Sequence, residues 1–313
     1  MGDYLLSSGQ TIAIGDRNGN LFKELSFDIF GAEEHSQLSR FCSGVVTPIS
    51  GRWIVLLEPQ APTYGHWLIE LVPRLLWMRE QLGNTVKDWN WFISGTGAPH
   101  EIYALEKAGI DPNRVKWCHQ AGEYLFDEAW IPGFTSRGGL NLSPEAIDRM
   151  RNYFCPPQVD APPLRVYLSR QNERFRKIVN EGDIIAALEK RGYSVFHPRE
   201  MSLEKKVEVC SRSEIFVTCI SSGTVHAAFM KPGGAFVEVM PKHFFAQVDW
   251  ALTEAAGLHY IVIPDREGET PANEGGNRYA DVEVDIPALM KALDLAENLV
   301  KPGLATSESG GKA

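Results

Sequence analysis

Short apolar runs and amphipathic segments alternate regularly through the second half of the chain. Five of the apolar runs have the length of strands: RVYLS, YSVFH, EIFVTCI, AFVEVM and HYIVIP. Between and after them lie segments with helical spacing: EGDIIAALEKRG, SLEKKVEVCSR, SGTVHAAFM, FAQVDWALTEAAG and PALMKALDLAENLV. This alternation predicts right-handed crossovers and a parallel sheet with helices on both faces. A ligand of such a sheet binds beyond the carboxyl ends of the strands, where the strand order reverses.

The first half of the chain begins with strand-like runs and continues as a mixture of helices and strands. Residues 1–60 predict β-structure, with hairpin turns at Asn18-Gly19 and at Ser50-Gly51. A strongly apolar helix is expected from Tyr64 to Met78. The remaining segments are expected to be the strands WNWFIS, RVKWC and EAWIP and the helices PHEIYALEKAG and SPEAIDRMRNYF, the last of them capped by Ser143.

A proline-rich segment separates the two halves. CPPQVDAPP, residues 155–163, has four prolines in nine residues, which is typical of a stiff, non-helical connector. We therefore predict an α/β protein with two domains, residues 1–155 with the β-rich start and residues 164–300 with the regular, Rossmann-like alternation. The polar tail, residues 301–313, is expected to be disordered.

Composition and charge narrow the class of protein. The chain has 313 residues, of which 44% are hydrophobic and 23% charged, as in ordinary globular proteins. Its formal charge of −9 argues against nucleic acid or an anionic membrane as the main partner. Its five cysteines are scattered and never form CxxC, which favours a reducing compartment over a disulfide framework or a zinc site. Since there is no signal-peptide pattern and no apolar run long enough to span a bilayer, we expect a cytoplasmic protein.

A basic segment follows the first strand of the second half. RVYLSRQNERFRKIVNE concentrates five basic residues in an otherwise acidic chain: Arg165, Arg170, Arg174, Arg176 and Lys177. Guanidinium groups match phosphate oxygens in a bidentate way and stay charged at any relevant pH. A basic loop at the carboxyl end of a buried strand is therefore well placed to hold a diphosphate. A solvated charged loop explains the pattern equally well, and Asn180 could simply cap the helix that begins at Glu181.

A second strand-to-helix junction, in CISSGTVHAAFMKPGG, consists of small and hydroxyl-bearing residues. It includes Ser221, Ser222, Gly223 and Thr224. These residues place backbone N–H groups and hydroxyls at a helix N-terminus, where anions bind, although any tight turn favours the same residues. His226 falls inside the expected helix, as either a packed or a functional histidine.

Glu238 ends the following strand, where its carboxylate could accept hydrogen bonds from ribose or serve as a partly exposed structural group. Other kinds of site lack their motifs, because the chain has no GxSxG, HExxH, GxxxxGK[ST] or DxD and no clean GxGxxG after a strand. This argues against a serine hydrolase, a zinc protease, a P-loop NTPase and a standard dinucleotide enzyme. The lack of DxD also favours a nucleotide site that uses arginines and helix dipoles over one that uses a divalent metal.

Three blocks of the chain together show a family pattern: YGHWLIELVPRLL, YLSRQNERFRKIVNE and EIFVTCISSGTVHAAFMKPGGAFVEVMP. They resemble the N-Y-G-H-W-L-x-D-x-L-P-R-L, Y-x-S-R…R-R-x-x-N-E and I-V-G-x-H-G-A-G-L-x-N-x-x-F-x-x-P-G-x-x-V-I-E blocks of glycosyltransferase family 61. That group includes bacterial capsular and exopolysaccharide enzymes. Order and spacing agree over roughly residues 60–241. The resemblance implies a GT-B-like fold, with two Rossmann-like halves around a cleft, and inverting transfer from a nucleotide sugar.

Carried over residue by residue, the resemblance places Arg170 and Arg176 near the donor diphosphate. Asn180 and Glu181 match the family's Asn-Glu pair, and Glu238 matches its strand-end glutamate.

The chain also departs from the family blocks. The family's His-Gly-Ala-Gly is replaced by residues 220–223, Ile-Ser-Ser-Gly, so its histidine is absent, and His226 stands where asparagine is usual. Serine hydroxyls still bind phosphate oxygens, but the altered turn leaves the identity of the donor open. Thr63 and Glu70 replace asparagine and aspartate, which are mild changes.

The apolar helix carries a titratable pair, His66 and Glu70, which lie four residues apart and therefore share a face. We expect Pro73 and Arg74 along the same side, facing the interdomain cleft, with a kink or an exposed carbonyl caused by Pro73. An inverting transfer needs a base for the proton of the acceptor hydroxyl, and histidine titrates near neutrality. Glu70 would orient the ring and stabilise its protonated form. The alternative is a structural pair that ties the helix to the β-region.

The sequence thus predicts an inverting, metal-independent glycosyltransferase that needs no cofactor. Its expected partners are a nucleotide-sugar donor and a glycan or lipid-linked glycan acceptor of surface polysaccharide synthesis. Because no segment spans a membrane, any membrane association would be peripheral, through a partner. Two alternatives remain, an inactive nucleotide- or glycan-binding relative that acts as a scaffold, and a sugar-phosphate epimerase on a similar frame.

Overall fold

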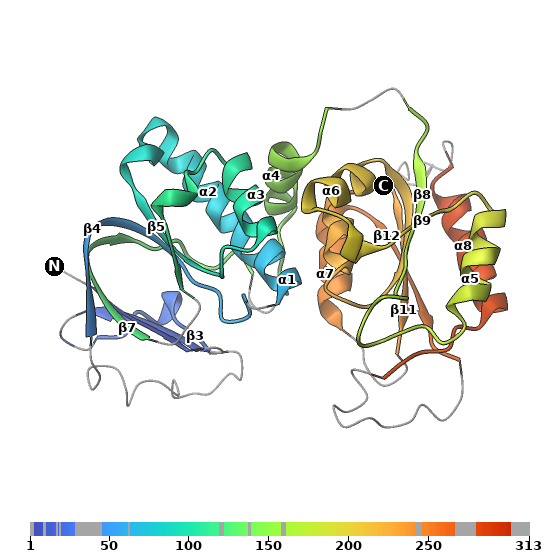
Figure 1. Cartoon of the computed structure of the whole chain (residues 1–313), viewed down its shortest axis with the longest axis horizontal. Coiled ribbons are helices and arrows are strands. Elements are labelled where there is room, and N and C mark those ends of the chain that lie inside the picture. The colour runs from blue at the N-terminus through green and yellow to red at the C-terminus, as the bar shows by residue number, and fades with distance from the viewer. Residues whose placement is uncertain are drawn as a thin grey trace, which may run out of the picture. The chain divides into compact units, whose positions relative to one another are not determined.

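A computed structural model of the chain describes residues 3–8, 11–16, 18, 20–28, 46–61, 63–118, 122–136, 139–157, 161–241, 246–266 and 280–301. The chain divides into two compact units, Met1–Phe154 and Cys155–Ala313, and each is described by itself (Figure 1). The predicted tail lies outside the described residues except for Lys301, as does Cys42. The other four cysteines form no disulfide within the described residues: Cys118, Cys155, Cys210 and Cys219.

The first unit is built on a sheet whose described strands follow the order β3-β2-β1-β7-β4-β5-β6. Strands β7, β4, β5 and β6 pair in parallel, whereas β1, β2 and β3 pair antiparallel and join the sheet through β1 and β7. The strand bounds are β1 Asp3–Ser8, β2 Thr11–Asp16, β3 Phe27–Asp28, β4 Val46–Leu56, β5 Asn90–Ser94, β6 Val115–Cys118 and β7 Gly122–Trp130. The N-terminal part is therefore β-rich, as predicted, and the chain reverses between β2 and β3 around Asn18, while Gly19 lies outside the described residues.

The hairpin predicted at Ser50-Gly51 is wrong. Strand β4 runs straight through these residues, and both of its parts pair in parallel with β7. The register shifts between Ile49 and Arg52, which makes the Ser-Gly dipeptide a bulge, and Gly51 has a φ of +95°. Its N–H donates to the Asp127 carboxylate at 3.0 Å. A glycine within a strand-like run fits either a turn or a bulge, and pairing with a distant strand decides between them.

The helices of the first unit agree closely with the sequence pattern. Their bounds are η1 Lys23–Leu25, α1 Tyr64–His66, η2 Trp67–Leu71, α2 Val72–Leu82, η3 Gly83–Asp88, α3 Pro99–Lys107, η4 Pro112–Arg114 and α4 Pro144–Phe154. Ser143 caps α4 as predicted, since its Oγ accepts the N–H of Ala146 at 3.2 Å. Buried apolar side chains fill the space beside the sheet, among them Val55, Phe92 and Phe126.

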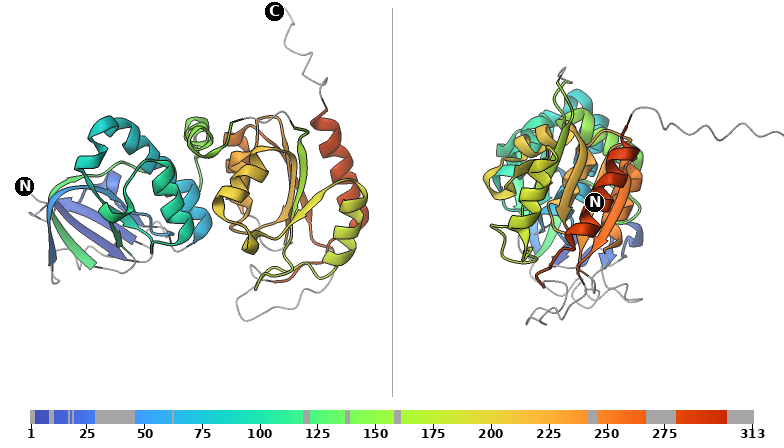
Figure 2. Two further views of the ribbon diagram at one scale, coloured as in Figure 1. Left: turned by 45° about the horizontal axis from the view of Figure 1, so that its top comes forward. Right: turned by 90° about the vertical axis from the view of Figure 1, so that its right-hand side faces the viewer.

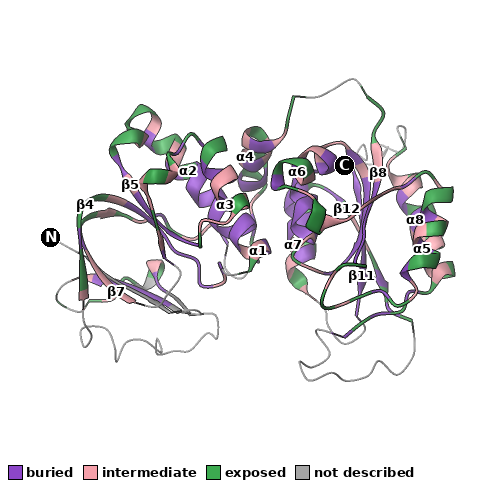
Figure 3. Cartoon of the chain, in the orientation of Figure 1, coloured by how far each residue is buried: buried purple, intermediate pink, exposed green. Residues whose placement is uncertain are grey.

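The second unit has a five-stranded parallel sheet in the order β12-β11-β10-β8-β9. The strands are β8 Leu164–Leu168, β9 Ser194–Phe196, β10 Ser213–Cys219, β11 Ala235–Met240 and β12 His259–Pro264. The helices are α5 Glu181–Lys190, η5 Pro198–Glu200, α6 Leu203–Ser211, η6 Thr224–Phe229, α7 Gln247–Ala256 and α8 Ile286–Leu299. Helices α5 and α8 cover one face, and α6 and α7 cover the other (Figure 2). Strand β11, which lies between β12 and β10, is buried along its whole length, which explains its continuous apolar run (Figure 3).

The predicted α/β class is thus confirmed, with parallel strands and helices in both units and additional strands at the N-terminus. One predicted helix of the second unit differs, because SGTVHAAFM contains only the six-residue 3-10 helix η6. A segment this short lacks the aligned peptide dipoles on which the predicted anion site partly relied. None of the described helices has the length and apolar character needed to cross a membrane.

Candidate active site

The strand order of the second unit identifies where a ligand would bind. In chain order the first strand, β8, has β9 on one side and β10 on the other, so the order reverses between β8 and β10. Such a switch point leaves a crevice at the carboxyl ends of the two strands. The basic loop follows β8, and the Ser221–Thr224 turn follows β10. The fold therefore brings together the two segments that the sequence selected for donor binding.

The two arginines of the basic loop have different surroundings. Arg170 is buried, and its guanidinium donates to the carbonyls of Phe175 at 2.6 Å and Arg176 at 3.3 Å, so it closes the loop from within. Arg176 is half-buried and has a φ of +53°. Its Nη1 donates to the carbonyl of Ile220 at 3.0 Å, which links the basic loop to the end of β10. Arg176 is thus the arginine at the switch point, and Arg170 supports it.

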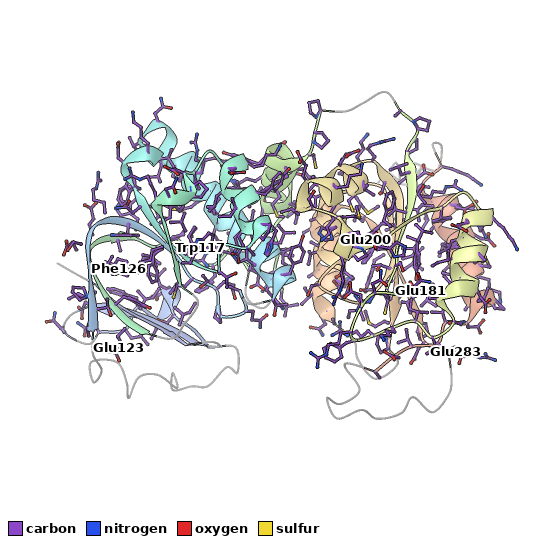
Figure 4. All side chains as sticks on the ribbon, in the orientation of Figure 1. Trp117, Glu123, Phe126, Glu181, Glu200 and Glu283 are labelled. Carbon is purple, nitrogen blue, oxygen red and sulfur yellow. The ribbon has the colours of Figure 1, made fainter. Side chains whose placement is uncertain are left out.

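Asn180 and Glu181 fix the base of this loop. The Glu181 carboxylate is buried in the second unit (Figure 4) and accepts hydrogen bonds from the Tyr167 hydroxyl at 2.7 Å and the Arg170 N–H at 2.6 Å. Asn180 makes no capping hydrogen bond and instead pairs through its side-chain amide with the backbone N–H and carbonyl of Val284. Both residues therefore contact protein groups that shape the loop.

The turn after β10 divides into an outer and an inner part. Ser222 is exposed, and Ser221 and Gly223 are half-buried, with the Gly223 N–H donating to the Ser221 Oγ at 3.1 Å. Thr224 is buried, and its hydroxyl lies 2.6 Å from both the Ser221 carbonyl and an Asp249 carboxylate oxygen. Asp249, on α7, thus anchors the turn from inside. The hydroxyls of Ser221 and Ser222 are the ones available to a ligand.

His226 and Glu238 are both fully enclosed. Burial, followed by the charge of Lys206, lowers the pKa of His226 to about 3, so its ring is neutral, with Nδ1 2.7 Å from the carbonyl of Gly223. Glu238 has no exposed surface, and the Tyr260 hydroxyl donates to it at 2.5 Å. Burial, followed by the charge of Asp249, raises the pKa of Glu238 well above its usual range. Its carboxyl therefore faces protein groups, which differs from the partly exposed glutamate expected as the structural alternative.

In the first unit, the helix that carries His66 has a widened turn. The segment Trp67–Leu71 is a π-helix, in which the N–H of Val72 bonds to the carbonyl of Trp67 five residues earlier. The widening comes directly before Pro73, which has no N–H to donate and disturbs the regular helix. Such π-segments occur frequently at functional sites. The helix therefore changes type just before Pro73, whereas the predicted kink or exposed carbonyl stays a prediction.

His66 contacts Glu70 as predicted, through its Nδ1 and the Glu70 Oε1. The His66 side chain is 25% exposed, whereas that of Glu70 is 1% exposed, so the carboxylate lies behind the ring. With Nδ1 directed at Glu70, Nε2 is the ring nitrogen left for a ligand. The expected polar stripe is otherwise internal, because Glu70, Pro73 and Arg74 are all buried in the first unit.

Arg74 ties the helix to the carboxyl edge of the first sheet. Its guanidinium donates to the carbonyls of Leu57 at 2.7 Å, Pro132 at 3.0 Å and Gly133 at 3.1 Å, in the loops that follow β4 and β7. Burial lowers the pKa of Arg74 to about 10, so it remains charged at neutral pH. The helix that presents His66 is therefore held at the ends of parallel strands, where such sheets bind ligands.

Sequence reasoning missed two acidic residues of these sites. Glu58 follows β4 closely and is buried near Glu70 and Arg74, and burial, followed by the charge of Glu70, raises its pKa to about 8. The signal was present in VLLEP, where a charged residue directly follows a buried strand. Asp249 had no such signal, since it lies within an ordinary amphipathic helix.

A family model described as Glycosyltransferase 61 matches residues 64–237. No curated protein matches the chain. Among solved structures, E. coli heptosyltransferase WaaC with ADP is 12% identical, with a TM-score of 0.36 over 80% of this chain and 100% of that chain. The iron-containing dodecameric glycosyltransferase TibC from enterotoxigenic E. coli H10407 is 11% identical, with a TM-score of 0.32 over 85% of this chain and 78% of that chain.

Proposed function

The chain belongs to glycosyltransferase family 61, and we propose that it is an inverting, metal-independent enzyme that transfers a sugar from a nucleotide-sugar donor. The proposed acceptor is a glycan or lipid-linked glycan of surface polysaccharide synthesis. The observation that carries the donor assignment is the hydrogen bond from Arg176 to the Ile220 carbonyl. It joins the two donor segments at the switch point of the second sheet.

The donor half would act on the leaving group. As the bond between the anomeric carbon and the diphosphate oxygen breaks, its electron pair moves onto the diphosphate. Positive charge and hydrogen-bond donors placed at that oxygen stabilise the transition state. Arg176 supplies the charge, and Ser221 and Ser222 supply hydroxyls that the protein leaves accessible. Arg170 and Glu181 hold the loop in shape, so that this arrangement exists before the donor binds.

The acceptor half would act on the nucleophile. While the acceptor oxygen attacks the anomeric carbon, Nε2 of His66 takes the hydroxyl proton and becomes part of an imidazolium. Glu70 accepts from Nδ1 and stabilises that cation from the buried side. A well-placed general base contributes ~10²–10⁴ in rate, and the rest of the acceleration comes from positioning and from the charge on the diphosphate.

Donor binding can be tested before any acceptor is known. A nucleotide sugar that fits the second unit should raise the apparent stability by about 2.7 kcal/mol at a hundredfold excess over its Kd, measured as a thermal shift. Arg176→Ala should abolish the shift. Arg174→Ala is the matched control, because Arg174 is exposed, lies two residues away and has its guanidinium over the Phe175 ring, 4.9 Å from the ring centroid.

The outcomes separate clearly. A shift that survives in Arg176→Ala but is lost in Arg174→Ala would move the donor site to the outer face of the loop. A panel of nucleotide sugars that produces no shift in the wild-type protein would contradict the donor assignment altogether.

One observation favours the scaffold alternative. Ile220 occupies the position of the family's histidine, and its side chain is buried and apolar, so it gives a ligand no polar group. A scaffold would bind the nucleotide sugar without releasing nucleotide, with or without acceptor. Release of nucleotide that depends on an added glycan acceptor would support the enzyme.

A further inference from the structure

The first unit buries three ionisable residues that act on one another, and one of them, Glu70, contacts His66. Glu58 is 3% exposed, Glu70 is 1% exposed and Arg74 is 2% exposed. Every hydrogen bond that Arg74 makes within the described residues goes to a backbone carbonyl, and none goes to a carboxylate. Arg74 therefore supplies charge to the two carboxyl groups without satisfying their oxygens.

In each of the two carboxyl groups, one oxygen accepts no hydrogen bond from the described residues. Glu58 Oε2 and Glu70 Oε2 are buried and have no hydrogen-bond partner among the described residues. If both groups were ionised beside a neutral His66, the cluster would hold two negative charges against the one positive charge of Arg74. An uncompensated charge in such a place is costly, and protons are taken up instead. One proton on one carboxyl group makes the cluster neutral.

The contacts indicate which carboxyl group holds that proton. Glu70 Oε1 contacts the ring nitrogen Nδ1 of His66, which favours an ionised carboxylate there. Within the described part of the chain, the Glu58 carboxyl group accepts only the N–H of Gln60, at 3.2 Å, and the backbone N–H of Glu58 donates to the Ser94 hydroxyl on β5 at 3.0 Å. Burial, followed by the charge of Glu70, raises the pKa of Glu58 to about 8, although the charge of Arg74 acts in the opposite direction.

We propose that Glu58 is a positioning residue that remains a neutral carboxylic acid at neutral pH, so that Glu70 is the only ionised carboxylate behind His66. A single carboxylate then receives the Nδ1–H of His66 and directs Nε2 outward. An ionised Glu58 would compete for the charge of Arg74 and leave a second negative charge beside the pair. The role assigned to Glu58 in the reaction rests on the proposed function, whereas its protonation state does not.

The protonation state can be measured without any activity. A carboxyl group whose pKa is higher in the folded protein than in the unfolded chain binds extra protons when folded, so stability falls as pH rises between the two values. For Glu58 this interval runs from its ordinary value of 4.5 to about 8. Glu58→Gln keeps the shape and removes the titration. We therefore compare the Tm of Glu58→Gln with that of the wild type at each pH. The difference, variant minus wild type, should be larger at pH 8.5 than at pH 5 by on the order of 5–10 °C.

Glu128→Gln provides the control for this measurement. Glu128 is exposed and paired with Arg52 at 3.1 Å, so the Tm difference of this variant should change little over the same range. A difference for Glu58→Gln that is equally flat would show that Glu58 is ionised in the folded protein and would overturn the proposal.

A second readout connects Glu58 to the reaction. The turnover number of the wild type should show an extra change as pH passes about 8, and Glu58→Gln, whose amide cannot ionise, should lack that change. If Glu58→Gln behaves like the wild type at every pH, the positioning role is wrong. If the Tm profile behaves as expected but neither protein transfers sugar, the proton on Glu58 is upheld and the proposed function fails.

Discussion

Replacing His66 with alanine is expected to lower turnover by ~10²–10⁴-fold when the acceptor is saturating, because the acceptor hydroxyl would lose its proposed base. The structure supports this role because the two residues of the pair differ in exposure. The side chain of His66 is 25% exposed, and its Nδ1 is occupied by the buried Glu70. A purely structural pair would gain nothing from leaving part of the His66 ring exposed. The measurement is kcat for the His66→Ala variant, with circular dichroism to show that the variant is folded.

His100→Ala is the matched control for this experiment. The His100 ring packs edge-on against the rings of Tyr64 and Trp67, with centroid distances of 4.8 Å and 5.5 Å. It therefore contacts the helix that carries His66 through aromatic packing. Its loss should change kcat only a few-fold. Wild-type turnover in a folded His66→Ala variant would remove His66 from the mechanism. Equal losses in both variants would show that packing of the helix matters and that a base does not.

Glu70→Gln refines the same prediction. The amide keeps the size of the side chain but carries no charge to stabilise an imidazolium, so kcat should fall while the KM for the donor stays close to wild type. A change confined to KM would indicate that the pair binds the acceptor and does not remove its proton.

The second unit could be predicted from sequence because its elements follow from local pattern. All five strand-like runs are strands to within two residues at each end, from β8 at Leu164–Leu168 to β12 at His259–Pro264. Buried parallel strands have few polar residues, and the helices between them have one apolar face. The strand order itself was not predicted, but both loops that the sequence selected for donor binding follow strands that flank the switch point, β8 and β10.

The features that escaped prediction depend on contacts between distant parts of the chain. Gly51 is a bulge because both parts of β4 pair with β7, which starts more than seventy residues later. The π-turn of Trp67–Leu71 depends on how the helix is held at the sheet edge and not on its composition alone. Glu58 is functional in our interpretation only because folding places it beside Glu70 and Arg74.

The same argument explains why Arg170, Glu181 and Glu238 match family positions without facing outward. Each of them lies in or beside the switch-point loops and satisfies groups that would otherwise be buried without partners: carbonyls for Arg170, an N–H and a hydroxyl for Glu181, and a hydroxyl for Glu238. A sequence motif records that a residue type is needed, but it does not distinguish contact with a ligand from support of the loop.

Arg74→Met is expected to lower the free energy of unfolding of the first unit by about 3–5 kcal/mol, a large part of the stability of an ordinary domain. The change would leave three carbonyls without their donor and two buried carboxyl groups without a positive charge. Urea denaturation followed by tryptophan fluorescence measures this unit, since seven of the eight tryptophans lie in it.

Arg79→Met is the matched control for Arg74→Met. It removes an arginine that also donates to backbone carbonyls, and so shows how much of the loss comes from hydrogen bonds alone. Arg79 lies on the same helix, is half-buried and donates to the carbonyls of Ala108 at 2.9 Å and Gly83 at 3.1 Å, so its loss should cost only about 1–2 kcal/mol. Adding Glu70→Gln to Arg74→Met should restore part of the loss, because the double variant no longer buries an unpaired carboxylate. An Arg74→Met protein with wild-type stability but no activity would instead make this arginine a ligand-binding group, and the helix would then need another anchor at the edge of the sheet.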